Sequence, residues 1–128
     1  MNDFDELKGY AKDAEIIATD VDDTITIDGL LTSEVVTAIK DIRTIGKKVI
    51  LVTGRSGGAG ATFSRYLPVE MVIAENGGVI IKDQMIKIID LPQDHKVRLH
   101  QCLEDIKRSF PVIKEAQDNL FRLTEESW

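Results

Sequence analysis

The chain has 128 residues, of which 43% are hydrophobic and 30% are charged, and its formal net charge is -6. This size and composition predict one compact domain with a hydrophobic core. The acidic balance argues against a nucleic acid or an anionic membrane as the main partner, and no apolar run approaches the roughly 18 residues of a membrane span. Because Cys102 is the one cysteine, no disulfide can form within the chain, and we expect a cytoplasmic protein.

A helix and an acidic strand end are the first predicted elements. Apolar side chains at helical spacing predict an N-terminal helical extension within residues 1–14. A short apolar strand follows at residues 15–19 and runs into Asp20, Asp22 and Asp23. Three carboxylates so close together need solvent, a shared proton or a cation such as Mg²⁺, because an unpaired buried carboxylate is costly. A metal site and a solvated acidic turn are both open at this point.

A helix and a second strand come next, in the order typical of a βαβ unit. The helix is predicted to begin at Thr32 or Ser33 and to end at Gly46. The apolar run at residues 49–52 predicts a buried strand parallel to the first. Thr-Gly-Arg-Ser at residues 53–56 and the glycines after it lead into another helix, which ends before Pro68. This glycine-rich turn either offers backbone N–H groups to an anion or merely eases the turn.

A third strand and a hairpin follow. Residues 71–74 predict the strand, which ends in the polar turn Glu75-Asn76-Gly77-Gly78. The apolar runs at residues 79–81 and 85–89 predict an antiparallel hairpin.

The C-terminal third is predicted to hold a helix, from residues 92–94 to residue 109, and a short strand around residues 120–123. His95 and His100 lie five residues apart, which does not place both on one helix face, so no metal pair is expected. Cys102 has no nearby base and is not expected to act as a nucleophile.

The polar ends of the three strands are expected to converge. Right-handed crossovers between parallel strands place their carboxyl ends at one edge of a sheet. The aspartates after the first strand, Thr53 after the second and Asn76 after the third would therefore share that edge. Carboxylates, hydroxyl and N–H donors, and ligands for a cation are what phosphoryl transfer requires.

Three motifs carry a resemblance to a known family. Asp20-Val21-Asp22-Asp23-Thr24 resembles the Asp-x-Asp-x-Thr motif of the haloacid dehalogenase superfamily of phosphatases. Val52-Thr53-Gly54-Arg55 is similar to its second motif, and Ala74-Glu75-Asn76-Gly77-Gly78 is similar to the Asn-Gly turn of the sugar-phosphate and sucrose-phosphate phosphatases. The resemblance covers roughly residues 15–90.

The resemblance implies an α/β fold with a Rossmann-like, three-layer αβα core, in which an antiparallel hairpin follows the third parallel strand. It divides the single domain 1–128 into an N-terminal helical extension at residues 1–14, a partial core at residues 15–78, and residues 79–128, which hold the hairpin and the start of a cap-like segment.

Catalytic roles are implied only for the matched positions. Asp20 would be the nucleophile that forms an aspartyl-phosphate, and it would bind Mg²⁺. Asp22 would be the general acid and base, and its backbone carbonyl would also bind the metal; such a group works best with a pKa raised towards neutral. The implied activity is Mg²⁺-dependent hydrolysis of a small phosphorylated metabolite. The implied phosphate- and substrate-binding residues are Thr53, Gly54, Arg55 and Asn76.

Two motifs of the superfamily are not found: the lysine that neutralises the nucleophile and phosphate, and the acidic motif that completes the Mg²⁺ shell. The core strands that follow the cap in relatives are missing as well, so residues 16–19 are expected to form an exposed sheet edge. We expect the N-terminal helix, the C-terminal helix, or a second copy or partner chain to cover this edge.

Three functions therefore stay open. The chain is a phosphatase, alone or with a partner that supplies the missing motifs; or it is a non-catalytic module that binds Mg²⁺ or phosphate or that oligomerises. A phospho-accepting receiver domain is disfavoured, because Glu75-Asn76 stands where that domain needs an acceptor aspartate.

Overall fold

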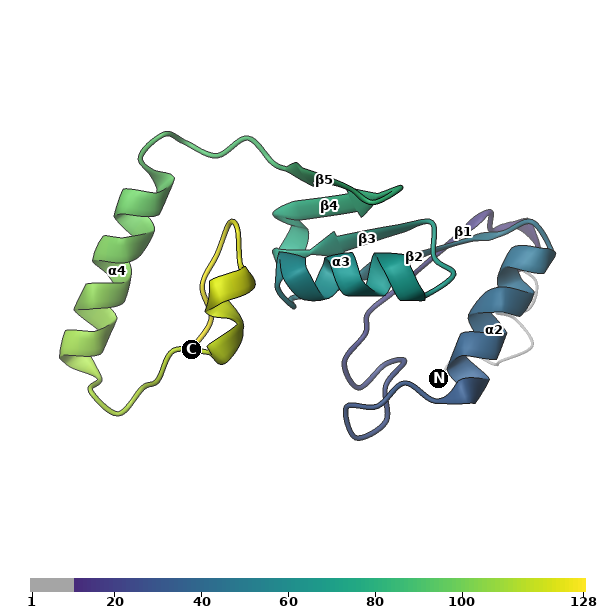
Figure 1. Ribbon diagram of the computed structural model, residues 1–128, viewed down its shortest axis with the longest axis horizontal. Coiled ribbons are helices and arrows are strands. Elements are labelled where there is room, and N and C mark those ends of the chain that lie inside the picture. Colours follow the sequence, from purple (N-terminus) through teal and green to yellow (C-terminus); the bar gives the residue numbers. More distant parts are fainter. Residues whose placement is uncertain (1–10) are drawn as a thin grey trace.

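A five-stranded sheet with the order β1-β2-β3-β4-β5 forms the centre of the computed structural model, which describes residues 11–128. β1, β2 and β3 run parallel, and β4 and β5 add to β3 as an antiparallel hairpin (Figure 1). The predicted α/β fold, with a parallel sheet followed by an antiparallel hairpin, is therefore confirmed. The strands are Ile16–Thr19 (β1), Lys48–Val52 (β2), Met71–Ala74 (β3), Val79–Lys82 (β4) and Met85–Ile88 (β5).

Helices α2 (Ser33–Thr44) and α3 (Gly57–Tyr66) connect the parallel strands and cover the same face of the sheet. Side chains alternate between the two faces along a strand, and every second one from β2, β3 and β4 belongs to one buried cluster. Ile39 of α2 lies in this cluster, and Phe63 of α3 packs against it. Both helices thus share one core with the sheet. The cluster consists of Val21, Ile39, Val49, Leu51, Val72, Ala74, Val79 and Ile81.

The local signals for α2 gave its bounds well. Thr32 is the N-cap residue, although its side chain makes no capping hydrogen bond. Gly46 follows the C-cap Ile45 with φ = 82°, a left-handed conformation that glycine adopts without steric cost.

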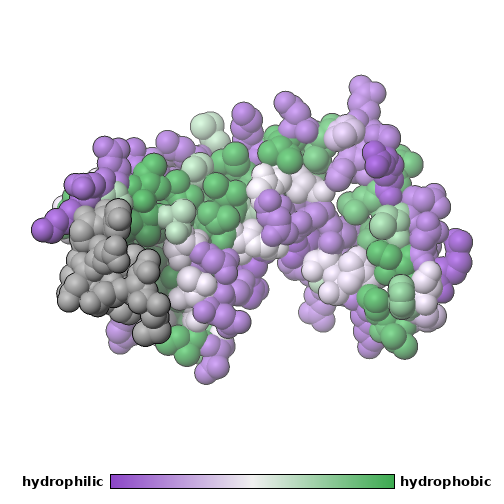
Figure 2. Space-filling view, turned by 180° about the vertical axis from the view of Figure 1, so that it is seen from behind, coloured by the Kyte–Doolittle hydropathy of each residue, from purple (hydrophilic) through white to green (hydrophobic). Residues whose placement is uncertain are grey.

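The opposite face of the sheet is covered by neither α2 nor α3. Alternation places Ile50, Val52 and Ile73 on this face, and Figure 2 shows hydrophobic residues gathered over the strands there. Of the three layers that the resemblance implies, residues 11–128 therefore supply two, the sheet and one layer of helices.

Among residues 11–128, β1 pairs with no strand other than β2, and Ile16 is 52% exposed, so β1 is the expected edge strand. Residues 11–13 are helical, whereas the rest of the predicted N-terminal helix lies outside the described residues. The C-terminal helix, His95–Ser109, does not cover this edge, because it stands apart from the sheet (Figure 1). Whether the N-terminal helix, a second copy or a partner chain covers the β1 edge stays a prediction.

Helix α4 (His95–Ser109) stands apart from the sheet, and the C-terminal residues lie between the two (Figure 1). The prediction of a helix here is confirmed, but the predicted strand around residues 120–123 is wrong. Gln117–Phe121 forms a 3₁₀ helix, η2, and the backbone N–H groups of Leu123 and Thr124 bind a carboxylate instead of a neighbouring strand. Among residues 11–128, every helix is too short or too polar to cross a bilayer.

Candidate functional site

A crevice of about 410 Å³ lies at the carboxyl ends of the three parallel strands. Asp20 follows β1, Thr53 and Gly54 follow β2, and Asn76 follows β3, so the parallel topology brings these residues to one place. The predicted convergence is confirmed for Asp20, Thr53 and Asn76, but it is wrong for Asp22, which lines a different pocket. Apolar side chains from the uncovered face of the sheet complete the lining, namely Val52 and Ile73.

Thr53 is held at the base of this crevice by hydrogen bonds to its neighbours. Its backbone N–H donates to the Ile73 carbonyl at 2.9 Å, and its own carbonyl accepts from the Asn76 N–H at 3.3 Å. The hydroxyl oxygen Oγ1 accepts from the Arg55 N–H at 3.1 Å, which leaves the hydroxyl hydrogen free to donate to a bound anion. The buried Thr53 side chain can therefore take the role expected of it.

The turn that places Asn76 in the crevice is left-handed. Glu75, Asn76 and Gly77 have φ values of 50°, 52° and 103°. Asparagine and glycine adopt this region readily, but for glutamate it costs of the order of 1 kcal/mol. The hydrogen bonds of the Glu75 side chain offset this cost.

Glu75 is a buried carboxylate, 2% exposed, that joins two segments. Oε1 accepts from the Gly57 N–H at 2.7 Å, and both oxygens accept from the Leu123 N–H, at 2.9 and 3.0 Å. Oε2 also accepts from the N–H and the hydroxyl of Thr124, each at 2.7 Å. Burial by itself raises the pKa of this carboxyl, but the donors of Thr124, Gly57 and Leu123 outweigh it and leave the pKa below its ordinary value.

Helix α3 therefore begins at an anion that the chain supplies itself. The Gly57 N–H, at the positive end of the helix dipole, is occupied by Glu75. The glycines after Arg55 serve close packing: a Cβ on Gly58 would lie 2.9 Å from Cβ of Phe121. The interpretation of this turn as an anion cradle is thus wrong for the amide of Gly57. Sequence reasoning missed Glu75, because a glutamate in a polar turn is usually solvated.

Asp22 lies outside the crevice and lines a neighbouring pocket with Arg55. Nη2 of Arg55 is 2.6 Å from Oδ1 of Asp22, and Nε lies 3.0 and 2.9 Å from the two carboxylate oxygens. The hydrogen bonds from Arg55 lower the pKa of Asp22, partial burial opposes them, and the positive charge of Arg55 adds to the lowering. The expectation of a pKa raised towards neutral is therefore wrong for this conformation.

The residues expected to bind Mg²⁺ are only partly arranged to do so. Within residues 11–128, no three His, Cys, Asp or Glu side chains lie close enough together to form a metal cluster. Mg²⁺ typically keeps several waters and binds one or two protein carboxylates together with substrate phosphate. Asp20 offers one exposed carboxylate to the crevice, whereas the Asp22 carboxylate is engaged by Arg55.

Comparisons with known proteins identify the family of the chain. Residues 17–127 match the haloacid dehalogenase-like hydrolase family. A phosphoglycolate phosphatase from Methanothrix thermoacetophila is 32% identical over 111 residues, which cover 87% of this chain and 46% of that protein.

Two solved structures share the fold. The crystal structure of a Thermoplasma acidophilum protein has a TM-score of 0.69 at 20% identity, covering 85% of this chain and 48% of that one. A phosphatase from Bacteroides thetaiotaomicron has a TM-score of 0.57 at 20% identity, covering 77% and 36%. The chain thus spans less than half the length of these proteins.

Proposed function

Since the chain belongs to the haloacid dehalogenase-like hydrolase family, we propose that its crevice binds and hydrolyses a small phosphomonoester. The observation that carries this proposal is that Asp20 shares the crevice with Thr53, Gly54 and Asn76. A carboxylate nucleophile there faces hydroxyl and amide donors that suit phosphoryl oxygens.

The proposed reaction has two displacements at phosphorus. A carboxylate oxygen of Asp20 attacks phosphorus, the bond to the leaving oxygen breaks, and Asp22 gives that oxygen its proton. Water then attacks the aspartyl-phosphate and gives a proton to the Asp22 carboxylate. Inorganic phosphate leaves and the Asp20 carboxylate is restored. Thr53 and Gly54 hold the phosphoryl oxygens throughout.

Arg55 takes part by exchanging partners. The proton on Asp22 is disfavoured while Arg55 is paired with it. A dianionic phosphoryl group in the crevice offers the guanidinium a stronger, bidentate partner. Substrate binding would therefore draw Arg55 away from Asp22 and free that carboxyl for proton transfer. Asn76 would orient the substrate beside it.

Mg²⁺ is proposed to bind at Asp20, with the backbone carbonyl of Asp22 as a second ligand. Such an ion would neutralise charge on the nucleophile and on the phosphoryl oxygens. The matching relative named as a phosphoglycolate phosphatase supports a small phosphorylated metabolite as the substrate class.

A phosphatase assay tests this function. The chain is incubated with p-nitrophenyl phosphate and Mg²⁺ and compared with Asp20→Asn and with Asp28→Asn, which changes an exposed aspartate in a turn. We expect Asp20→Asn to lower turnover by about 10³-fold or more, because the nucleophile is lost, and Asp28→Asn to leave it unchanged. Turnover that survives Asp20→Asn contradicts the proposal.

A second candidate, a module that binds Mg²⁺ or phosphate without turnover, is favoured by one observation. Among residues 11–128, those that line the crevice include no lysine or arginine, and a cation is what stabilises the transition state of phosphoryl transfer. Absent turnover, together with a melting temperature that Mg²⁺ raises in the wild type but not in Asp20→Asn, would support this module.

A further inference from the structure

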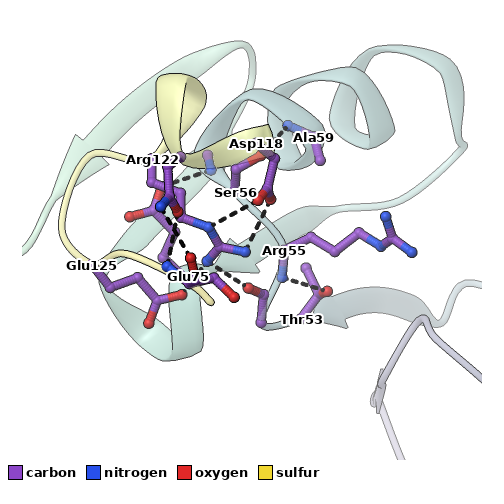
Figure 3. Close-up of polar contacts among 12 residues, drawn as sticks. Thr53, Arg55, Ser56, Ala59, Glu75, Asp118, Arg122 and Glu125 are labelled. Carbon is purple, nitrogen blue, oxygen red and sulfur yellow. Dashed lines mark hydrogen bonds and ion pairs between the residues drawn. The ribbon is translucent and has the colours of Figure 1, made fainter. Parts of the chain in front are cut away.

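Residues 117–125, which we call the C-terminal strap, form hydrogen bonds with the two crevice loops that follow β2 and β3. Nη1 of Arg122 donates to the Gly54 carbonyl at 3.0 Å, and Oε2 of Glu125 accepts from Nδ2 of Asn76 at 2.9 Å. The Arg122 side chain is 6% exposed and also pairs with Asp118 at 2.9 Å and with Glu125. Figure 3 shows this guanidinium between the two carboxylates, beside Glu75, while Arg55 points away. The strap therefore holds Gly54 and Asn76, two residues that line the crevice, through hydrogen bonds from outside it.

The strap sits so close to the rest of the chain that small residues are needed beneath it. A Cβ on Gly78 would overlap Oγ1 of Thr124, and a Cβ on Gly57 would lie 3.3 Å from Cδ1 of Leu123. At such distances the strap fits in one position against the rest of the chain, and an added methyl group there must displace it. The centre of this contact is Glu75, whose carboxylate accepts hydrogen bonds from the N–H groups of Leu123 and Thr124.

We propose that Glu75 is a positioning residue for the crevice: by fixing Leu123 and Thr124 it sets where Arg122 and Glu125 hold Gly54 and Asn76. The connection is short, because Arg122 precedes Leu123 and Glu125 follows Thr124. Glu75 also binds the loop after β2 directly, since its N–H donates to the Arg55 carbonyl at 3.0 Å. That phosphate is the ligand rests on the proposed function; the coupling itself does not.

Two variants disturb the contact between Glu75 and the strap by different chemistry. Glu75→Gln keeps the shape but turns an NH₂ group, itself a donor, towards backbone N–H groups that need an acceptor. Gly78→Ala leaves the carboxylate intact and places a methyl group where Oγ1 of Thr124 lies; Gly78 has φ = -68°, which alanine adopts freely. Glu70→Gln is the matched control, because Glu70 is a partly exposed carboxylate that pairs with Lys82 at 3.2 Å.

The test uses the full ¹⁵N-labelled chain, amide hydrogen exchange, and titration with inorganic phosphate in the presence of Mg²⁺. We expect Glu75→Gln and Gly78→Ala to speed exchange at Leu123 and Thr124 and to shift the side-chain amide signal of Asn76. We also expect them to weaken phosphate binding about tenfold, the usual size of a coupling between sites. The amides of Leu51 and Val72 stay protected, and Glu70→Gln changes none of these readouts.

A purely structural role for Glu75 predicts a different result. It would lower stability without changing phosphate affinity in the folded molecules, and that outcome overturns the inference. Unchanged exchange at Leu123 and Thr124 also overturns it. If Glu75→Gln exposes the amides of Leu51 and Val72, the result of Gly78→Ala decides.

Failure of the proposed function is distinguishable from failure of this inference. If the wild-type chain binds no phosphate, the proposed ligand is wrong. The NMR signals of the Gly54 backbone amide and the Asn76 side-chain amide then test whether Glu75 is coupled to the crevice. Signals that shift in both variants support it, and signals that stay unchanged overturn it.

Discussion

Arg55 and Asp22 form an ion pair that joins the loop after β2 to the loop after β1, with Nη2 of Arg55 2.6 Å from Oδ1 of Asp22. The proposed acid thus faces a guanidinium, while the proposed nucleophile Asp20 faces the crevice. Two carboxylates that are neighbours in sequence therefore have different surroundings. In this conformation the proposed acid is paired with a cation, whereas the proposed nucleophile is open to a ligand in the crevice.

The first prediction concerns the pKa of Asp22 in metal-free solution. Arg55→Gln should raise this pKa towards the ordinary value of 3.8, because the hydrogen bonds and charge that favour the carboxylate are lost. A ¹³C NMR titration of the Asp22 carboxyl carbon measures the shift. Arg65→Gln, which changes an exposed arginine in the last turn of α3, is the control. A pKa equal to that of the wild type would show that the pair does not persist in solution.

The sign of the effect on stability follows from the same pair. Because the folded-state pKa of Asp22 lies below its unfolded value, the pair stabilises the fold above that unfolded pKa, and the contribution is lost as pH falls through the folded pKa. The two side chains are 52% and 41% exposed, so solvent limits the contribution to about 0–1 kcal/mol. Arg55→Gln should therefore lower the free energy of unfolding at neutral pH by no more than about 1 kcal/mol.

The order of strands and the convergence of their ends could be predicted from sequence, because both follow from local patterns and chain handedness. Apolar runs such as residues 49–52 locate the strands, and the polar residues after them then share one edge. The roles of Glu75 and Arg122 could not be predicted in this way. The bonds of Glu75 to Thr124 span 49 residues, and the bond from Arg122 to Gly54 spans 68. No local pattern specifies such pairs.

The wrong strand at residues 120–123 has the same origin. Leu120, Phe121 and Leu123 make an apolar run typical of a strand. Leu120 and Phe121 instead belong to the 3₁₀ helix, and the Leu123 N–H binds the Glu75 carboxylate, a side chain whose burial the sequence does not reveal. A local propensity was overridden by a distant buried charge.

The second prediction concerns packing between α3 and the sheet. In Gly60→Ala the new methyl group would lie 3.0 Å from Cβ of Ala74 and 2.8 Å from Cδ1 of Ile81. Overpacking of a core costs about 1–3 kcal/mol, whereas the gain in helix propensity is at most about 1 kcal/mol. Urea unfolding should show a lower free energy of unfolding than in the wild type. Thr62→Ala, an exposed change on the same helix, is the control. Equal stability of Gly60→Ala would mean that α3 shifts away from β3 without cost.

The third prediction concerns the pH dependence of stability. The folded-state pKa of Glu75 lies below its ordinary value of 4.5, so its contribution to stability is present above that value and is lost as pH falls through the folded pKa. At neutral pH we expect Glu75→Gln to cost about 1–3 kcal/mol, since buried donors lose a charged acceptor. Below about pH 4 the cost should shrink, because a protonated Glu75 has the same conflict of donors as glutamine. Urea unfolding of both proteins from pH 7 to pH 3 measures the difference, with Glu70→Gln as the control. A constant difference at every pH would show that folding does not lower the pKa of Glu75.

The fourth prediction concerns Lys47, whose Nζ donates to the carbonyls of Ala11 and Lys12 at 2.9 Å and of Ala14 at 2.5 Å. An ammonium at the last carbonyls of a helix satisfies acceptors that have no partner in the helix and interacts favourably with its dipole. Lys47→Met should therefore loosen residues 11–14 at a cost of about 0.3–1 kcal/mol. Faster amide hydrogen exchange at Ala14 and Glu15, with unchanged exchange at Leu51, would verify this.

Lys48→Met changes the adjacent, exposed lysine and should leave these rates as they are. Since the ordering of this segment beside β1 depends on a charge, high salt should speed exchange in the wild type and have little effect in Lys47→Met. If Lys47→Met and Lys48→Met behave alike, the ammonium does not hold the segment.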